Sequence, residues 1–248
     1  MAARLKTLAS STHADVAAFF DAAAPAYSEQ HGPGERLLRY RLDLIREVAR
    51  FAAADTVLEI GCGNGLHLLG LSREFNRGLG VDLSPAMIDA ARAVARDRGQ
   101  EQRVIFAVDK GEHLSSVEDA SVDVVFCVGA LEHMLDQRGV FRSASRVLRS
   151  GGRFVCLTLN GASLWYRWLG PALRYDTRRL STDHYLSCAE LRQLAQAGFG
   201  NQKIDSWTFI QKGDMPKPVA RLLELADHAG RIANLVWLRG GLRLLALK

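Results

Sequence analysis

The residues of this 248-residue chain whose types and spacing could do chemistry are a glycine-rich turn and the acids that follow it. The apolar run Val57–Ile60 enters the turn Gly61–Gly65, and a second apolar run ends at Asp82. Glycines let the backbone turn sharply and approach a ligand closely. An acid at the tip of the neighbouring strand can accept both hydroxyls of a ribose. The pattern predicts a nucleoside pocket formed by a strand, a turn and the start of a helix.

Two classes of enzyme share such a turn, namely dinucleotide-dependent dehydrogenases and enzymes that use S-adenosylmethionine. The three glycines here are spaced GxGxG, whereas the dinucleotide fingerprint is GxGxxG. Glu59 places an acid inside the first strand, where that fingerprint is usually apolar throughout. A third apolar run, Val104–Val108, ends at another acid, Asp109. These details favour S-adenosylmethionine as the ligand.

Five segments resemble, in order and spacing, a class I S-adenosylmethionine-dependent methyltransferase. They are VLEIGCGNG, GVDLSPAMIDAA, the strand that ends at Asp109, SVDVVFCVGALEHM and RVLRSGGRFVCLTLN. Within that superfamily the chain is most similar to the small-molecule branch that includes ubiquinone and menaquinone methyltransferases, methyltransferase type 11. The resemblance is good over residues 50 to 160 and weak elsewhere. It is specific for cofactor and fold and poorly specific for substrate.

The resemblance implies an α/β fold, with a Rossmann-like, seven-stranded, mostly parallel sheet, helices on both faces, an antiparallel last strand and helical cap insertions. We expect a single methyltransferase domain over residues 1–248. Its parts would be an N-terminal helical cap (1–51), a cofactor-binding core (54–160) and substrate-side insertions (161–186 and 213–238).

Local patterns predict where several helices and strands begin and end. Ser84 before Pro85 is a helix cap, and Ser187 with Glu190 forms a capping box. The predicted helices are Asp15–Tyr27, Leu37–Phe51, Pro85–Arg98 and Gln137–Leu148. Beyond the strands already named, the predicted strands are Val122–Val128, Arg153–Leu159, Gln202–Phe209 and Leu242–Leu247.

The resemblance also implies roles for residues around the cofactor. Asp82 would bind the ribose hydroxyls, and Leu83 and Met87 would press on the adenine, although Met87 also suits a core position. Asp109 would accept a hydrogen bond from the adenine amino group, with a simple loop acid as the alternative. The predicted cofactor-binding residues are Glu59, Gly61, Gly63, Gly65, Asp82, Leu83, Met87, Asp109, Lys110, Gly111, Cys127 and Gly129.

His133 and Tyr27 are the predicted residues on the substrate side. An imidazole titrates near neutral pH, so His133 could remove a proton from a hydroxyl or ammonium nucleophile. The alternative is a histidine that caps or packs the next helix. Tyr27 resembles an aromatic residue that helps close the site over the cofactor in quinone-type enzymes, with packing on the core as the alternative. His184 beside Asp183 could form a second acid/base pair or lie exposed in a loop.

Composition fits a single globular domain, with 48% apolar residues and 24% charged residues. The net charge of +5 is mostly dispersed, so no nucleic-acid partner is expected. One local group of arginines, interleaved with aromatic residues, could be a solvated helix face, a pocket wall for an anionic or aromatic substrate, or an RNA contact. This group comprises Arg167, Arg174, Arg178 and Arg179, with Trp165, Tyr166, Trp168 and Tyr175.

The chain shows neither a secretory signal nor an apolar stretch that would span a bilayer. The longest late apolar stretch, Ile232–Leu247, is too short and too charged. Four cysteines occur singly, which argues against a zinc site and a disulfide framework. We therefore expect a cytoplasmic protein, and no cluster of residues suggests a metal.

The resulting prediction is an S-adenosylmethionine-dependent methyltransferase that acts on a hydroxyl or amine of a small molecule, a quinone precursor or secondary metabolite. Two alternatives are an NAD-dependent oxidoreductase and a noncatalytic S-adenosylmethionine-binding protein. RNA methylation is a further alternative, which the dispersed charge disfavours. The acceptor, the methylated atom and the oligomeric state stay open.

Overall fold

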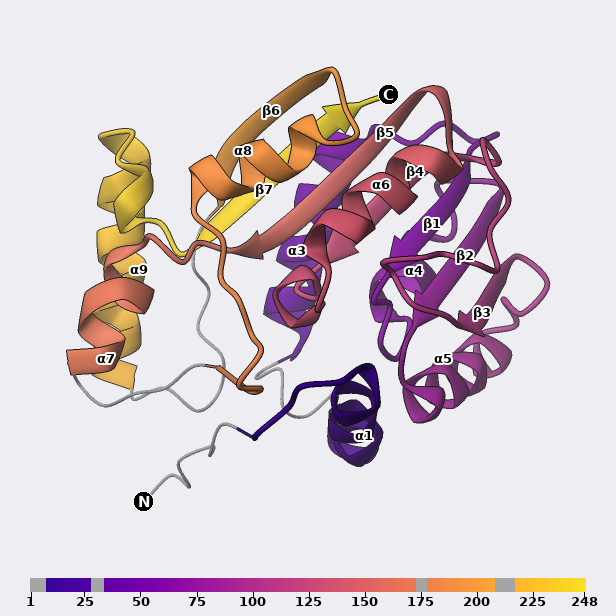
Figure 1. Ribbon diagram of the computed structural model, residues 1–248, viewed down its shortest axis with the longest axis horizontal. Helices are drawn as coiled ribbons and strands as arrows, with labels where there is room; N and C mark the ends of the chain where they lie inside the picture. The colour runs from indigo at the N-terminus through magenta and orange to yellow at the C-terminus, as the bar shows by residue number, and fades with distance from the viewer. Residues whose placement is uncertain (1–7, 28–33, 173–177, 208–216) are drawn as a thin grey trace.

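A seven-stranded sheet forms the centre of the molecule, with the strands in the order β3-β2-β1-β4-β5-β7-β6 (Figure 1). The computed structural model describes residues 8–27, 34–172, 178–207 and 217–248. The strands are β1 (Thr56–Ile60), β2 (Arg77–Asp82), β3 (Val104–Val108), β4 (Val122–Val128), β5 (Leu148–Leu159), β6 (Asn201–Trp207) and β7 (Gly241–Leu247). The first five strands of this order, β3, β2, β1, β4 and β5, pair in parallel with one another. Strand β7 runs antiparallel to both β5 and β6. The predicted Rossmann-like sheet with an antiparallel last strand is confirmed.

Helices cover both faces of this sheet and enclose two buried apolar clusters. One cluster joins the sheet to α3, α4 and α5, and the other joins it to α6 and α8. A central strand buried on both faces is expected to be apolar, as β4 is from Val124 to Val128. These helices are α3 (Gly34–Ala49), α4 (Leu66–Leu71), α5 (Pro85–Asp97), α6 (Gln137–Val147) and α8 (Cys188–Gln196).

Most element boundaries follow local signals that the sequence carries. Ser84 accepts the Met87 amide at 3.1 Å at the start of α5, and the capping box of Ser187 and Glu190 opens α8. The largest boundary error is in β5, which begins at Leu148 and not at Arg153. Leu148 pairs with Val122 across a register shift, which extends the strand through its glycines. The predicted helices Asp15–Tyr27 and Leu37–Phe51 differ by two to four residues at each end from the observed α-helices, which are His13–Ala23 and Gly34–Ala49. The predicted end of β6 at Phe209 lies outside the described residues.

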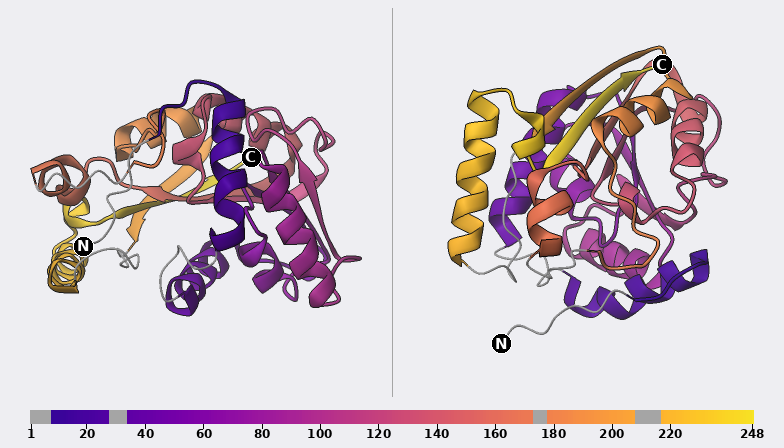
Figure 2. Two further views of the ribbon diagram at one scale, coloured as in Figure 1. Left: turned by 90° about the horizontal axis from the view of Figure 1, so that it is seen from below. Right: turned by 60° about the vertical axis from the view of Figure 1, so that its left-hand side comes forward.

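Three segments flank the sheet beyond the ends of its strands, namely the N-terminal segment and the two predicted insertions (Figures 1 and 2). The N-terminal segment contains α1 (His13–Ala23) and η1 (Ala24–Ala26). The insertions contain the π-helix η3 (Trp165–Leu169), α7 (Gly170–Ala172), α9 (Lys217–Ile232) and η4 (Val236–Leu238). Trp165 of η3 packs on Leu223 of α9, so the two insertions share a small apolar cluster. In the described part of the chain, no helix has the length and apolar character needed to cross a membrane.

Candidate active site

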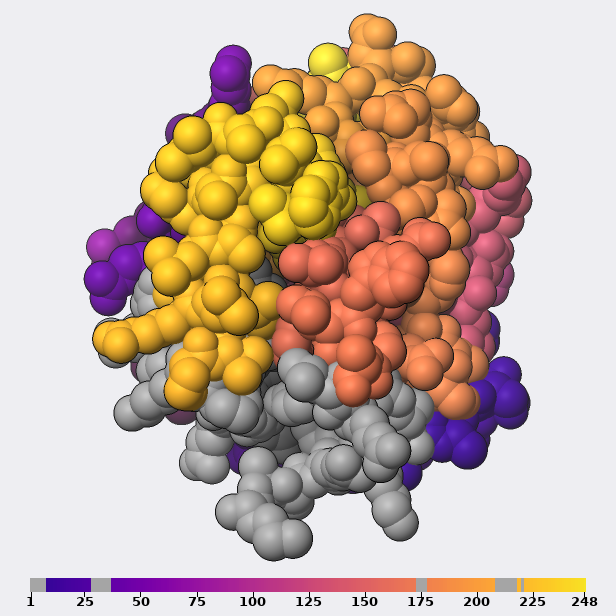
Figure 3. Space-filling view, turned by 90° about the vertical axis from the view of Figure 1, so that its left-hand side faces the viewer, coloured from indigo at the N-terminus to yellow at the C-terminus, as the bar shows by residue number. Residues whose placement is uncertain are grey.

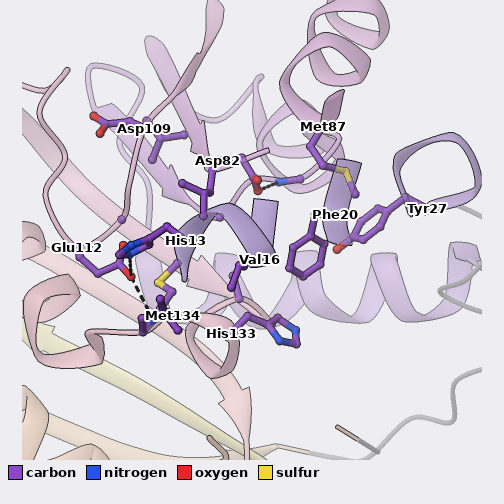
Figure 4. Close-up of a pocket in the computed structure, with 18 residues that line it drawn as sticks. His13, Val16, Phe20, Tyr27, Asp82, Met87, Asp109, Glu112, His133 and Met134 are labelled. Atoms are coloured by element: carbon purple, nitrogen blue, oxygen red, sulfur yellow. Dashed lines mark hydrogen bonds and ion pairs between the residues drawn. The ribbon is translucent and has the colours of Figure 1, made fainter. Parts of the chain in front are cut away.

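A cleft lies where the carboxyl ends of β1, β2 and β4 meet helix α1 (Figure 4). It holds about 640 Å³ of empty space, part of it open to solvent. Ten of the 14 site residues predicted from the sequence line this one cleft. The lining residues are His13, Val16, Phe20, Tyr27, Gly61, Gly63, Val81, Asp82, Leu83, Met87, Asp109, Gly111, Glu112, Gly129, Ala130, His133, Met134 and Leu135.

The glycine turn after β1 presents its main chain to the cleft. Gly61 and Gly63 have φ angles of +69° and +51°, a conformation that glycine adopts without steric cost. The amides of Gly61 and Cys62 donate to the Val81 carbonyl at 2.8 and 3.0 Å, which ties the turn to β2. A Cβ on Gly61 would lie 2.4 Å from the Cβ of Ala130. The close approach therefore requires glycine at position 61.

Asp82, the last residue of β2, places a carboxylate beside this turn. Its Oδ2 accepts the Gly63 amide at 2.8 Å, and its Oδ1 accepts the Ser84 amide at 2.9 Å. Burial raises the pKa of Asp82, and these backbone hydrogen bonds oppose that shift. Each carboxylate oxygen keeps a further lone pair. Asp82 can therefore accept ligand hydroxyls while the turn holds it in place.

Asp109 also lies in the cleft, but its carboxylate is engaged by its own loop. Its Oδ1 accepts the Lys110 amide at 2.7 Å, and its Oδ2 accepts the Ser116 amide and hydroxyl at 2.7 and 2.6 Å. In Figure 4 the carboxylate points away from Asp82. Burial raises the pKa of Asp109, but the hydrogen bonds from Ser116 and Lys110 outweigh it and lower the pKa. This geometry fits an acid that stabilises its own loop better than an acid that binds the adenine amino group. The adenine contact of Asp109 stays a prediction.

Glu59 does not line the cleft and serves the scaffold instead. Its side chain is fully buried, with Oε1 3.0 Å from His67 Nδ1 and Oε2 accepting the Leu68 amide at 3.2 Å. Burial raises the pKa of this carboxyl group. Glu59 thus joins β1 to the first turn of α4, directly after the glycine turn.

Three further predicted cofactor residues also lie off the cleft lining. A Cβ on Gly65 would lie 2.7 Å from Phe106 of β3, so the third glycine allows close packing of α4. Cys127 is buried inside β4. Lys110 contributes its amide to the Asp109 loop. The neighbouring glycines Gly111 and Gly129 do line the cleft.

Helix α1 crosses the cleft and is attached to both of its sides. Asp21 accepts a backbone amide at the start of α5 at 3.0 Å. At the other end, His13 Nε2 lies 3.2 Å from Glu112 Oε1. The Tyr27 ring comes within 3.3 Å of the point where a Cβ on Gly63 would lie, and burial raises its pKa to about 12. Tyr27 therefore lies against the turn, where the predicted lid residue would lie.

His133 forms a pair with a carboxylate that the sequence did not assign to it. His133 Nδ1 lies 2.7 Å from Asp183 Oδ1, and the Asp183 side chain is fully buried. Asp183 Oδ2 accepts the amides of Arg179 and Leu180 at 2.7 and 3.1 Å. The His133 ring meets Phe20 of α1 edge-on, with ring centroids 5.3 Å apart. Within the described part of the chain, His133 Nε2 forms no hydrogen bond.

The neighbouring histidine, His184, is not part of this pair. Its side chain is 57% exposed and its Nε2 lies 3.3 Å from Glu190 Oε1. The alternative of an exposed loop histidine therefore describes it. Asp183, which precedes His184 in the sequence, pairs with His133 instead. It can do so because the first insertion folds so that residues 179–183 lie beside the cleft.

Arg41 of α3 lies beside the cleft residue Gly129, and the sequence reasoning missed it. It is only 7% exposed, and its Nε forms no hydrogen bond with any described residue. One terminal nitrogen lies 3.5 Å from the point where a Cβ on Gly129 would lie. Burial lowers the pKa of Arg41, opposed by Tyr27 and Glu132. Because its Nε forms no hydrogen bond among the described residues, this buried guanidinium favours an anionic ligand group beside Gly129.

Comparison with known proteins shows what this geometry resembles. Residues 58–156 match the family described as a methyltransferase domain. The predicted resemblance to a class I methyltransferase is therefore confirmed, and the comparisons lend no support to an NAD-dependent oxidoreductase or a noncatalytic protein.

Two relatives and one solved structure show how far the similarity extends. The ubiquinone biosynthesis O-methyltransferase of Xanthomonas oryzae pv. oryzae (strain PXO99A) is 29% identical over 62% of this chain and 64% of its own length. That of Xanthomonas euvesicatoria pv. vesicatoria (strain 85-10) is 28% identical over 75% of this chain and 82% of its own length. The [4+2]-cyclase SpnF has a TM-score of 0.69 and 19% identity, covering 98% of this chain and 99% of its own. The match therefore spans just under two-thirds of the first relative, and the likeness to SpnF shows the fold alone.

Proposed function

We propose that this chain transfers the methyl group of S-adenosylmethionine to a hydroxyl group of a small molecule. The observation that carries the proposal is the pair of His133 and Asp183, 2.7 Å apart, at the edge of the cleft. A hydroxyl nucleophile needs a base to remove its proton, whereas an amine can arrive neutral. Relatives described as O-methyltransferases support the same choice.

The cleft residues suit the parts of the cofactor. Asp82 would accept the ribose hydroxyls, with the main chain of Gly61 and Gly63 beneath them. Leu83 and Met87 would provide the apolar contacts of the adenine. When bound, S-adenosylmethionine supplies a methyl group on a positively charged sulfur, which a nucleophile can displace in line.

Arg41 would hold the carboxylate of the methionine moiety. Its guanidinium is buried beside Gly129, at the end of β4, and lacks a carboxylate partner among the described residues. Arginine presents donors in a planar fork that matches a carboxylate. This assignment orients the cofactor along the cleft, from Met87 at one end to Gly129 at the other.

His133 would act as the general base, and Asp183 would be its positioning residue. Asp183 accepts the Nδ1 proton, which leaves the lone pair on Nε2 to accept a proton from an acceptor hydroxyl. The carboxylate then stabilises the imidazolium that forms. Helix α1 covers the cleft and places Phe20 against the imidazole ring, which limits the access of water.

The proposal is tested by comparing matched acceptors. The purified chain would be incubated with methyl-labelled S-adenosylmethionine and a set of phenols. A parallel set would contain anilines in which an amino group replaces the hydroxyl of each phenol, and the rate of methyl transfer would be measured for both sets. We expect transfer to at least one phenol and much slower transfer to its aniline. Equal or faster transfer to the anilines would assign the site to amines, and failure to bind S-adenosylmethionine in calorimetry would refute the function itself.

A further inference from the structure

The outer surface of the insertions has a feature that the cleft does not explain, because large apolar side chains there face solvent. On α9, Leu222, Leu225 and Ile232 are 62%, 68% and 75% exposed. Trp168 on η3 and Trp237 on η4 are 64% and 51% exposed. In Figure 3 the surface of α9 (yellow) adjoins that of η3 and α7 (salmon) on one side of the molecule. We call this surface the insertion face.

The exposed residues of α9 form a strip along the helix. Leu222, Leu225 and Ile232, together with the exposed Ala229, are spaced by three, four and three residues. At 3.6 residues per turn, such positions share one side of a helix. Leu223, one of the buried residues of α9, packs on the opposite side against η3. The helix is therefore apolar on two sides, and only one of them contacts the rest of the described chain.

The charges beside this strip are predominantly positive. Arg221 and Arg231 are exposed on α9. The two carboxylates of the helix are less accessible to solvent, since Glu224 is half-buried and Asp227 is 1% exposed. The net charge of the whole chain, +5, has the same sign. The insertion face thus combines an apolar strip, two tryptophans and a cationic border.

We propose that the insertion face binds the surface of a bilayer that contains anionic lipid. Helices that lie in a membrane interface bury a strip of leucine and tryptophan and keep lysine or arginine at its border. Tryptophan favours the headgroup region, and each arginine near an anionic surface is attracted to it. Helix α9 would lie parallel to the membrane plane, with Trp168 and Trp237 beside it.

A second copy of the chain fits the same face less well. A two-fold axis in the interface would set two α9 helices either antiparallel or parallel, because such interfaces use the same patch on both partners. The Arg221 end of one helix would then lie beside the Arg231 end or the Arg221 end of the other. Like charges opposed across an interface are unfavourable, and no exposed carboxylate of α9 offsets them.

The test is flotation of the full chain with vesicles of phosphatidylcholine alone or mixed with phosphatidylglycerol. We expect binding to the mixed vesicles, weakened by salt. L222E/L225E should lower binding about tenfold or more, since it replaces apolar contact with negative charge. R221E/R231E should lower it about tenfold. The matched control is I105E, on β3 at the far edge of the sheet, where Ile105 is 56% exposed; it should bind like the unmodified chain.

Calorimetry with S-adenosylhomocysteine checks that each variant keeps its fold, since a folded variant should bind this ligand like the unmodified chain. If L222E/L225E does not bind it, flotation of R221E/R231E decides the test. The proposal is wrong if the unmodified chain does not float with the mixed vesicles, or if the folded variants float equally well. It is also wrong if sedimentation velocity shows a dimer that L222E/L225E converts to a monomer, because the face would then join two copies. None of these outcomes depends on methyl transfer.

Discussion

The side of the cleft that we propose for the cofactor and the side that we propose for the acceptor differ in how far apart along the chain their interacting residues lie. On the cofactor side, Asp82 binds Gly63 across 19 residues, within one strand–turn–helix–strand unit. On the acceptor side, His133 meets Asp183 across 50 residues, and His13 meets Glu112 across 99. The first contact is built by a local motif, and the other two are built by segments added around the sheet.

This difference has a consequence for function. The local unit fixes the carboxylate and the turn together, so it can be kept while the covering segments change. SpnF, a cyclase, shares the fold with this chain over nearly its whole length, which shows that the sheet alone does not determine the reaction. The acceptor and the chemistry must therefore be sought in His133, Asp183 and the segments that cover them.

The largest expected effect falls on the acceptor side. His133→Ala should lower kcat for a phenol acceptor by about 10²- to 10⁴-fold, the usual contribution of a general base. The affinity for S-adenosylhomocysteine should change little, because the imidazole would face the acceptor. Steady-state kinetics and calorimetry measure the two quantities. An unchanged kcat would show that His133 only packs against α1.

On the cofactor side, Asp82→Ala should weaken S-adenosylhomocysteine binding by about 100-fold or more, since hydrogen bonds to a charged group contribute about 1.5–3 kcal/mol each. Isothermal calorimetry measures the loss. Asp97→Ala, at the far end of α5, serves as a control in which binding should be unchanged. If Asp82→Ala bound the ligand as tightly as the unmodified chain, the ribose assignment would be lost.

The sequence predicted contacts between residues close along the chain better than contacts between distant residues. The turn, Asp82 and the cap at Ser84 were predictable because each depends on residues close by. Asp183 was associated with its neighbour His184, since nothing local shows that the insertion carries it to His133. Arg41 lies in an amphipathic helix with other arginines, and its burial depends on tertiary packing. Asp109 was predictable as a strand-tip acid, but the hydrogen bonds from Ser116 decide its orientation.

A smaller effect is expected from Asp183→Asn, which tests whether Asp183 acts through His133. It should lower kcat about 10- to 100-fold, because an amide can hold the ring in the wrong tautomer and cannot stabilise the imidazolium. The informative measurement is the double variant with His133→Ala, which should be no slower than His133→Ala alone. Independent, multiplying losses would instead indicate that Asp183 only supports the loop of residues 179–183.

The smallest effect is expected for Asp109→Asn, which separates a loop acid from an adenine ligand. If the carboxylate serves Ser116 and Lys110, the variant should lose about 1 kcal/mol of stability at neutral pH and keep its affinity for S-adenosylhomocysteine within about twofold. The hydrogen bonds lower the pKa of Asp109 below its ordinary value of 3.8, so their stabilisation is present above that value and is lost as the pH falls through the lowered pKa. Urea unfolding should therefore show a difference between variant and unmodified chain that is constant above pH 5 and shrinks in stronger acid. A large loss of affinity for S-adenosylhomocysteine with an unchanged free energy of unfolding would instead show that Asp109 binds the adenine.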